Sequence, residues 1–483
     1  MTSFFHNHII ILVLILSLVC AGLMTRIMRN PKLGLYLTFF ATGILLSPNL
    51  PVVREKLSGA EFLMMITWFA ILVRRKKSEP STIFTKNQTR AVVWGGVFVG
   101  WIVFSFFWNS FFNSEVYKTH SVASIVETCN FIYGYLMFLT VVFMVKDWET
   151  WKNCVVGWLW GAVVVSFVGV LAFAGHAPAW AYDSFSHRIC STLRTENQVP
   201  SFLMPIFVLL VFMTVERGTK IKFRLVRLVL LGGVFLTSLG TGGRTCFLMM
   251  ILSVFLVLYV ARKEWRFHAF NWMRLVKMFM VLFFSMIFYV YFALTNFNGD
   301  YSLGTTPAWQ RPVAMMYEWI EGHRVLDVNR EHELAVVSEN IGDNLVVGTG
   351  PKNYGSIYGV EEIHNTYAGM LFQTGIPGLV LLLLWLGSSL WAGWRAGKKL
   401  VIPQQRLYVM CMLAGMILIL FYGLTIFGLR QRNIWLLAGL LVAAESLVPR
   451  RWRPSIFQRR ENPIMISGDG ASVLPISDSS GKS

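Results

Sequence analysis

Charged residues are scarce in this sequence, and their scarcity excludes a soluble fold. Only 14% of the 483 residues are charged, whereas 55% are hydrophobic. Apolar runs close to the ~20 residues that span a bilayer recur along the whole chain, and a water-soluble core cannot hide that much apolar surface. The composition therefore predicts an integral membrane protein whose main solvent is lipid.

Acidic residues are absent from the middle of the long apolar runs. The seven Asp residues all lie in predicted loops or in the tail. Four Glu residues lie near predicted helix ends, where we expect their carboxylates to reach water: Glu61, Glu127, Glu216 and Glu445. A transporter driven by protons or sodium ions usually binds the ion at a carboxylate near the bilayer midplane. The sequence therefore disfavours such a transporter.

Cysteine is also rare, and its pattern predicts no metal site. The six residues lack paired metal-ligand spacing and fall mostly in apolar runs: Cys20, Cys129, Cys154, Cys190, Cys246 and Cys411. Another group is more typical of a solvated helical face than of a metal site: His323, Glu331, His332 and Glu333. We therefore expect neither a metal ion nor a cofactor.

Thirteen apolar stretches are candidates for membrane spans. They lie at 8–25, 33–47, 59–73, 91–108, 125–145, 153–175, 199–215, 225–239, 245–261, 276–295, 370–394, 407–427 and 433–447. Because several are shorter than ~20 residues, we expect about twelve to fourteen spans in an all-helical bundle. The first stretch has no Lys or Arg before it and no cleavage pattern after it, so we interpret it as a retained helix.

Basic residues number 43 against 25 acidic ones and give a formal net charge of +18. Of the 43, 31 lie in seven alternate segments between or after apolar runs, and loops of this kind face the cytoplasm. Since this placement orients helices, the positive charge predicts no nucleic-acid partner. The other twelve lie on the opposite side, where topology does not explain them: Arg54, Lys56, Lys118, Arg188, Arg194, Arg244, Arg311, Arg324, Arg330, Lys352, Arg430 and Arg432.

The sequence divides into four parts. Residues 1–295 hold ten predicted spans, 296–367 form a large outer loop, 368–449 hold three more spans, and 450–483 form a basic and then disordered cytoplasmic tail. The outer loop has enough aromatic and apolar residues to fold partly into helices, with helical spacing at 312–340. Its turn-rich segment at 348–355 lacks the ending of a nucleotide-binding loop.

Four polar residues of the outer side are candidates for chemistry: Arg188, Arg194, Arg244 and His364. Arginine suits a diphosphate, because its planar fork gives two parallel charge-assisted hydrogen bonds to phosphate oxygens. Histidine suits the removal of a proton from a sugar hydroxyl near neutral pH. The ordinary alternatives are an arginine that anchors lipid headgroups and a loop histidine without a chemical role.

Three stretches that contain these residues resemble the O-antigen ligase and Wzy polymerase family of membrane glycosyltransferases. The first runs from Arg188 to Asn197 and is similar to an Arg-x-x-Gly-x-Phe segment ending in Asn, although Ser and Leu replace the Gly and Phe. The second is Gly242-Gly-Arg244. The third, at 344–378, combines Gly-Thr-Gly, His-Asn-Thr-Tyr and Gly-Ile-Pro-Gly.

The resemblance implies a helical enzyme of the GT-C type that needs neither a nucleotide nor a metal ion. Arg188 and Arg244 are then expected to hold the diphosphate of an undecaprenyl-diphosphate-linked glycan, and His364 to activate the acceptor hydroxyl. The same motifs supply further candidates for substrate binding: Arg194, Asn197, Lys352 and Asn365. The expected place of reaction is the periplasmic face of a bacterial inner membrane.

Polymerase and ligase activities both fit these motifs, and we slightly favour a polymerase of envelope polysaccharide. The acceptor of a polymerase is a second lipid-linked glycan, whereas a ligase uses lipid A core or a protein. Membrane lipids and other polysaccharide-assembly proteins are the expected partners. Two alternatives belong to other classes: a lipid-linked glycan flippase or other transporter, and a structural subunit without chemistry.

Overall fold

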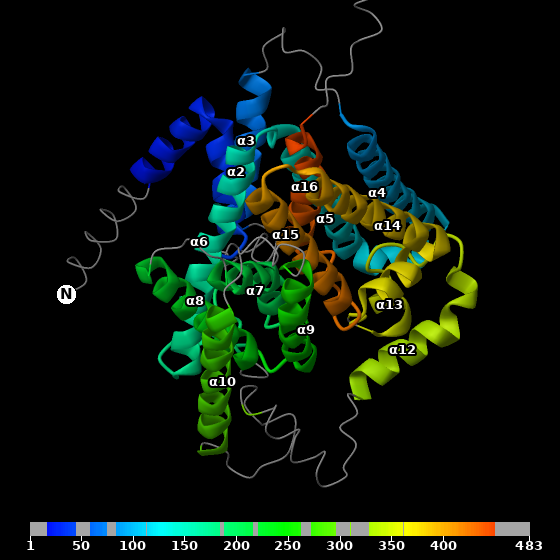
Figure 1. Cartoon of the computed structure of the whole chain (residues 1–483). Coiled ribbons are helices and arrows are strands. Elements are labelled where there is room, and N and C mark those ends of the chain that lie inside the picture. Colours follow the sequence, from blue (N-terminus) through cyan, green and yellow to red (C-terminus); the bar gives the residue numbers. More distant parts are fainter. Residues whose placement is uncertain are drawn as a thin grey trace, which may run out of the picture. The chain divides into compact units, whose positions relative to one another are not determined.

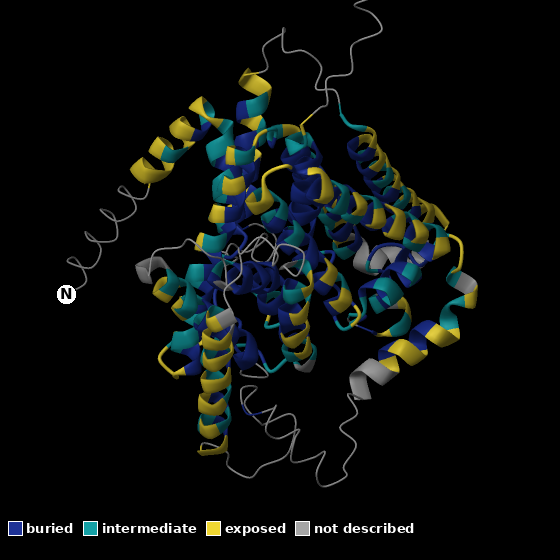
Figure 2. Ribbon diagram, viewed as in Figure 1, coloured by how far each residue is buried: buried dark blue, intermediate teal, exposed yellow. Residues whose placement is uncertain are grey.

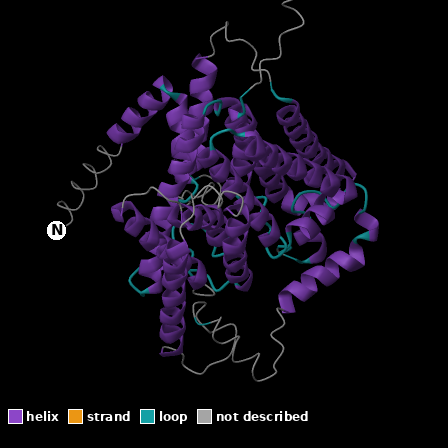
Figure 3. Ribbon diagram, in the orientation of Figure 1, coloured by secondary structure: helices purple, strands orange, loops and turns teal. Residues whose placement is uncertain are grey.

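The computed structural model describes residues 17–44, 58–74, 84–112, 114–183, 188–215, 221–261, 272–295, 310, 328–360 and 362–449. Within these residues the chain forms helices, turns and one isolated β-bridge between Tyr182 and Ile189, and it forms no strand (Figure 3). The prediction of an all-helical protein is therefore confirmed. Contacts group residues 1–448 in one unit, and the predicted tail at 450–483 lies outside the described residues.

Six helices in the described part of the chain are long and apolar enough to cross a membrane. They are α4 (Lys86–Phe112), α5 (Ser114–Met144), α6 (Trp148–Phe173), α10 (Trp272–Thr295), α14 (Thr366–Lys399) and α15 (Pro403–Tyr422). A helix rises ~1.5 Å per residue, so about 20 residues cover the hydrocarbon core of a bilayer. The protein is therefore a multi-pass membrane protein, as its composition predicts.

The other described apolar stretches are helical too, but each is shorter or carries charge. They are residues 17–29, α2 (Pro31–Ala41), α3 (Gly59–Arg74), α7 (Gln198–Val215), α8 (Ile221–Gly240), α9 (Arg244–Ala261) and α16 (Arg432–Ala443). The helix α2 extends only about 16 Å, and α8 begins with Lys222, Arg224 and Arg227, which favour a membrane surface. Six spans meet the length requirement, and the larger number of twelve to fourteen stays a prediction.

The helices α16 and α10 differ strongly in burial (Figures 1 and 2). All residues of α16 from Asn433 to Ala443 are buried, because α16 packs between α5, α14 and α15. By contrast, α10 packs on α7 and α8 and exposes Phe283, Phe288 and Tyr291. An exposed aromatic face of this kind suits contact with lipid. The bundle therefore has a dry centre and an apolar outer face.

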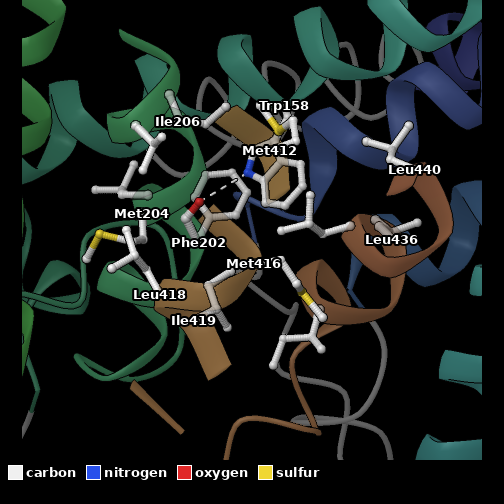
Figure 4. Packing of buried hydrophobic residues seen from close by; sticks show 14 of the residues in the cluster. Trp158, Phe202, Met204, Ile206, Met412, Met416, Leu418, Ile419, Leu436 and Leu440 are labelled. Carbon is white, nitrogen blue, oxygen red and sulfur yellow. Dashed lines mark hydrogen bonds between the residues drawn. The ribbon is translucent and has the colours of Figure 1, made fainter. Parts of the chain in front are cut away.

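The first turn of α7 packs against α6 and α15 (Figure 4) and is hydrogen-bonded to α16. The indole nitrogen of Trp158 donates a hydrogen bond to the carbonyl of Phe202 at 3.1 Å, and both rings are buried. The side-chain amide of Asn433 donates to the carbonyl of Ser201 at 2.9 Å. Because hydrogen-bonded packing of this kind leaves little freedom, the starts of α7 and α16 are fixed beside each other.

The helix α14 is broken at Gly375, whose backbone has φ 69° and ψ −175°. The preceding loop docks on this break. Gly350 donates its backbone N–H to the carbonyl of Gln373 at 3.0 Å, and Ile376 donates to the carbonyl of Leu345 at 2.8 Å. These bonds replace those that the helix loses at the break, which is required where backbone polar groups are buried in a membrane protein.

The backbones at this docking lie too close for side chains. A Cβ on Gly348 would lie 2.3 Å from the carbonyl carbon of Gln373, and one on Gly375 would lie 2.4 Å from the carbonyl oxygen of Val346. Both glycines also have positive φ angles, which other residues rarely adopt. The glycine motifs of the third stretch therefore contact each other, and they hold the first half of α14 against the loop.

Candidate functional site

His364 lies immediately before α14 in a backbone segment that is anchored on both sides. The next residue, Asn365, is the N-cap of α14, and its side-chain oxygen accepts a hydrogen bond from the backbone N–H of Tyr367 at 2.9 Å. Thr366 donates its backbone N–H to the carbonyl of Gly423 at 2.7 Å. Gly423 opens the connector of residues 423–431 between α15 and α16. These contacts fix the backbone at His364.

Glu333 binds His364 through both of its carboxylate oxygens. Oε1 lies 2.8 Å from the ring nitrogen Nδ1, and Oε2 accepts the backbone N–H of His364, also at 2.8 Å. The imidazole is 35% exposed and the carboxylate only 10%. A carboxylate on Nδ1 places the proton of the neutral ring there, so that Nε2 is the basic nitrogen. This arrangement is the one that a general base requires.

Glu333 is buried, whereas the sequence predicts that it lies on a solvated helical face. Glu333 lies on α12 (Val328–Asn340), a helix of the predicted outer loop, where His332 is exposed as expected. Val336 and Val337 of α12 are buried among residues of the loop and α14. The helix therefore docks through an apolar face, and Glu333 enters the interface because His364 satisfies its charge. His323 lies outside the described residues.

The segment of Arg188 lies beside the turn that precedes Arg244. Ile189 donates its backbone N–H to the carbonyl of Gly240, the last residue of α8, at 3.4 Å. Arg188 pairs within its own segment, since its Nη1 lies 3.0 Å from Oε1 of Glu196. The fold thus makes neighbours of the first two motifs of the sequence.

Arg194 and Asn197 lie in the same segment and are partly buried. The side-chain amide of Asn197 lies 3.5 Å from Oε1 of Glu196, the atom that also binds Arg188. The backbone N–H of Arg194 donates to the side-chain oxygen of Gln198 at 3.2 Å. Glu196 therefore gathers the polar side chains of this segment, and the predicted roles of Arg194 and Asn197 in substrate binding stay predictions.

Arg244 is the first residue of α9 and follows a tight turn in which Gly242 has a φ of 70°. The first turn of a helix favours an anion, because unpaired backbone N–H groups and the helix dipole point toward it. A Cβ on Gly243 would lie 4.0 Å from the hydroxyl of Tyr422 at the end of α15. The turn therefore lies near the side chain of Tyr422, the residue before the connector. The side chain of Arg244 lies outside the described residues.

Arg430 in the connector binds two carboxylates from distant parts of the chain. Its Nε lies 2.6 Å from Oε1 of Glu127 on α5, and its Nη1 lies 2.9 Å from Oε1 of Glu362, two residues before His364. Burial alone lowers the pKa of this guanidinium, but the two carboxylates outweigh it and raise the pKa above its ordinary value. Arg430 is therefore a permanent cation that ties α5 to the segment of His364.

Arg432 makes a second set of long-range bonds at the first residue of α16. Its Nε lies 2.6 Å from Oε1 of Glu61 on α3, and its Nη2 lies 3.4 Å from the side-chain oxygen of Asn130 on α5. It also donates to the carbonyl of Arg430. The sequence places both arginines among the twelve cations that topology does not explain, but no motif singles them out. Glu362 is 68 residues from Arg430, and the other side-chain partners are 302 to 371 residues away, so sequence spacing gives no signal.

The acidic residues near helix ends do not reach water as the sequence predicts. Glu61, Glu127 and Glu445 are only 4%, 3% and 7% exposed. Glu61 and Glu127 pair with the two connector arginines, while Glu445 accepts a hydrogen bond from the side chain of Asn87 at 2.7 Å. A carboxylate is buried at low cost only when it is paired, so these partners explain the difference. Glu216 lies outside the described residues.

Lys352 lies in the turn between the docked glycines and α13 (Tyr354–Tyr358), with a positive φ of 56°. Its side chain is partly buried, and its predicted role in substrate binding stays a prediction.

Tyr354 is fully buried next to Arg430, and burial raises the pKa of its hydroxyl to about 12. The hydroxyl therefore stays protonated at neutral pH.

Among the described residues, one group has the side-chain proximity that a metal ion needs: Asp183, Cys190 and Glu196. Its chemistry fits a cation poorly. Arg188 already places a positive charge on Glu196. Burial raises the pKa of the Cys190 thiol, and the nearby carboxylates of Glu196 and Asp183 raise it further, so a thiolate is disfavoured. The group is better described as the electrostatic surroundings of Arg188.

No protein-family model matches this chain, and no curated protein matches it.

Proposed function

We propose that this protein is a glycosyltransferase of bacterial envelope polysaccharide assembly, of the O-antigen polymerase or ligase type. It transfers a glycan from an undecaprenyl diphosphate to an acceptor hydroxyl, and polymerisation is slightly favoured over ligation. The observation that carries the proposal is the Glu333–His364 pair, a base with a fixed proton position. The connector anchors the pair through Thr366, and Tyr422, just before the connector, lies near the turn of Arg244, which in turn lies beside the segment of Arg188.

The proposed reaction uses one base and two cations. Nε2 of His364 takes the proton of the acceptor hydroxyl as its oxygen attacks the anomeric carbon of the donor sugar. The bond between that carbon and the diphosphate oxygen breaks, and its electron pair leaves with the undecaprenyl diphosphate. Arg188 and Arg244 stabilise the negative charge that develops on the leaving group. Glu333 stabilises the imidazolium that forms and keeps the ring in place.

The proposed location is the bacterial inner membrane, with the site at the periplasmic end of the helices. The alternation of loop charge supports this orientation, because the opposite helix ends carry most of the basic residues. All of the contacts of His364, Arg188 and the connector described above fall at the end with fewer basic residues. At that end a lipid-linked glycan and its acceptor meet after the glycan has crossed the membrane.

The proposal is tested by following the glycan of a deletion strain complemented with variants at matched membrane expression. His364→Ala removes the base. We expect the rate at which full-length glycan forms to fall by roughly 10²- to 10⁴-fold. Glu333→Gln keeps the shape but removes the charge, and we expect a smaller loss. His332→Ala is the matched control, because His332 is exposed on the same helix as Glu333.

The product that accumulates identifies the activity. Single repeat units on the lipid indicate a polymerase, whereas finished but untransferred lipid-linked glycan indicates a ligase. Arg244→Lys sharpens the test, because it keeps the charge and removes the bidentate fork. Full-length glycan from both His364→Ala and Glu333→Gln, equal to that of His332→Ala, contradicts the proposal.

A further inference from the structure

Several helices of the bundle begin or end halfway along their neighbours. The short helix α2 ends at Ala41, and a Cβ on the nearby Gly43 would lie 3.2 Å from the carbonyl oxygen of Gly161, in the middle of α6. The start of α7 reaches the same level, because the indole of Trp158 on α6 donates to the carbonyl of Phe202. The fold therefore places the end of α2 and the start of α7 near the middle of a spanning helix.

The helices α3 and α16 begin near the middle of another spanning helix, α5. Arg432, the first residue of α16, bonds to the side chain of Asn130 in this part of α5 and to Glu61 in the first turn of α3. Arg430 pairs with Glu127, also near the middle of α5. Charged side chains and irregular backbone occur at such depth only inside a protein or along a water-filled cavity. The two ion pairs therefore mark a polar region deep in the bundle.

A cavity of about 20 Å³ lies in this polar region. It is lined by Thr42, Leu193, Gln198, Phe202, Arg430, Gln431, Arg432 and Asn433. A space of this volume admits one water molecule and is far too small for a sugar or a diphosphate. Water is therefore the class of ligand that fits by size.

Two residues on the cavity wall carry buried polar atoms without a hydrogen-bond partner among the described residues. These atoms are Nη2 of Arg430, which is a donor, and the side-chain oxygen of Gln431, which is an acceptor. A water molecule accepts from the first and donates to the second, whereas a metal ion suits only the oxygen and a halide suits only the guanidinium. Since buried polar groups are rarely left unpaired, both atoms fit the same ligand.

The exposure of the charged side chains decreases from the outer end of the candidate site toward this cavity. His364 is 35% exposed, Arg430 is 20% exposed and Arg432 is 15% exposed. The carboxylates of Glu127 and Glu61, on the far side of the two arginines, are only 4% and 5% exposed. This order indicates a path for solvent that narrows inward and ends at the connector arginines.

We propose that water enters the bundle from the end of His364 as far as the middle of the spanning helices, and that one ordered water molecule in the cavity joins Arg430 to Gln431. The inference goes beyond the proposed function, because it concerns the hydration of the bundle and requires no glycosyl transfer. Water at this depth hydrates the two arginines on the side that faces away from their carboxylates.

The first test measures how fast single cysteines react with a membrane-impermeant methanethiosulfonate reagent. Gln198→Cys and Gln431→Cys introduce thiols at the cavity, in a background that carries Cys20→Ser and Cys129→Ser. The control is the native Cys129 with Cys20→Ser, because Cys129 lies at a similar level of α5 on the exposed face that holds Ile125. We expect both variants to react about tenfold faster than Cys129 in spheroplasts, since a thiol ionises in water and not in lipid.

A second measurement uses the wild type in lipid nanodiscs. Hydroxyl-radical footprinting with X-rays modifies side chains that lie beside bound water. Phe202 lines the cavity and is 2% exposed, whereas Phe207 on the same helix is 0% exposed and does not line it. We therefore expect Phe202 to be modified several times faster than Phe207, although both rings are buried.

Faster reaction of both cysteine variants in spheroplasts, together with faster modification of Phe202, supports the inference. Reaction no faster than that of Cys129 overturns it, as does reaction only in inverted vesicles, which present the basic loops to the reagent. Equal modification of Phe202 and Phe207 also overturns it. Thermal unfolding establishes that each cysteine variant is folded, and if neither folds the footprinting decides. Glycan formation is not measured in these tests, so the proposed function stands or falls separately.

Discussion

The two arginine groups at this end of the bundle differ in where their carboxylate partners come from. Arg188 pairs with Glu196, eight residues away, and both side chains are partly exposed. Arg430 and Arg432 pair with Glu127 and Glu61 from α5 and α3, and these carboxylates are almost fully buried. The difference teaches that Arg188 can move without disturbing other helices, because its partner lies in the same segment. The connector arginines, by contrast, hold distant helices together.

The largest effect is expected for Glu127→Gln, which leaves Arg430 buried without its first carboxylate. Removing one partner of a buried ion pair costs about 3 kcal/mol, and only the more exposed carboxylate of Glu362 then remains beside Arg430. Thermal unfolding of the purified variant in detergent should show a clear fall in Tm. A double variant Glu127→Leu/Arg430→Met should recover part of this loss. If it does not, the ion pair is not the cause.

A second large effect is expected for Gly375→Ala, where another long-range contact is made by backbone alone. The new Cβ would meet the carbonyl of Val346, and the positive φ adds strain, so we expect a loss of about 2 kcal/mol. Gly387 provides the control in the same helix, since nothing lies within 4 Å of its Cβ position. Gly387→Ala should be neutral or stabilising by about 0.5 kcal/mol. Equal Tm values for the two variants would contradict the docking.

A smaller effect is expected for Glu196→Gln in the local group. Partly exposed ion pairs contribute less than about 1 kcal/mol, and Arg188 stays at the edge of its segment. We therefore expect a nearly unchanged Tm together with altered glycan formation, because Arg188 gains freedom at the predicted diphosphate position. A fall in Tm as large as that of Glu127→Gln would remove the contrast between the two groups.

The smallest effect is expected for Lys32→Met. Lys32 pairs with Asp147 at 3.0 Å across 115 residues, but the two side chains are 45% and 49% exposed. Because the two residues are distant in sequence but exposed, this pair tests whether sequence distance or burial determines how much an ion pair stabilises the fold. We expect a change of about 0 to 0.5 kcal/mol in the free energy of unfolding. A cost like that of Glu127→Gln would mean that distance along the chain, and not burial, decides.

The sequence predicts the helices better than it predicts their lengths. Apolar runs locate every described helix that can span a membrane, because hydropathy reports the solvent of a segment directly. They overstate the length of α2, because the apolar run at 33–47 corresponds to a helix that ends at Ala41. An apolar run is also compatible with a buried helix that stops short of the bilayer, and tertiary packing decides between the two.

The sequence likewise selects some residues of the candidate site and misses others. Residue type and local motif are enough to select Arg188, Arg244 and His364, and the glycines at 348 and 375 are explained by close backbone contact. Glu333, Arg430 and Arg432 could not be selected, because their roles depend on partners brought together by the fold. A buried carboxylate on a polar helix such as α12 has no signature in a single sequence.

The anchoring of Thr366 on the connector also governs when the site can exist. His364 is synthesised well before residue 423. Its backbone position nevertheless depends on the hydrogen bond from Thr366 to the carbonyl of Gly423, and the nearby carboxylate of Glu362 is bound by Arg430. The base is therefore assembled only after α15 and α16 have been made and inserted. A chain that contains every motif residue but lacks α15 and α16 therefore does not hold His364 in this position, and under the proposed function it should be inactive.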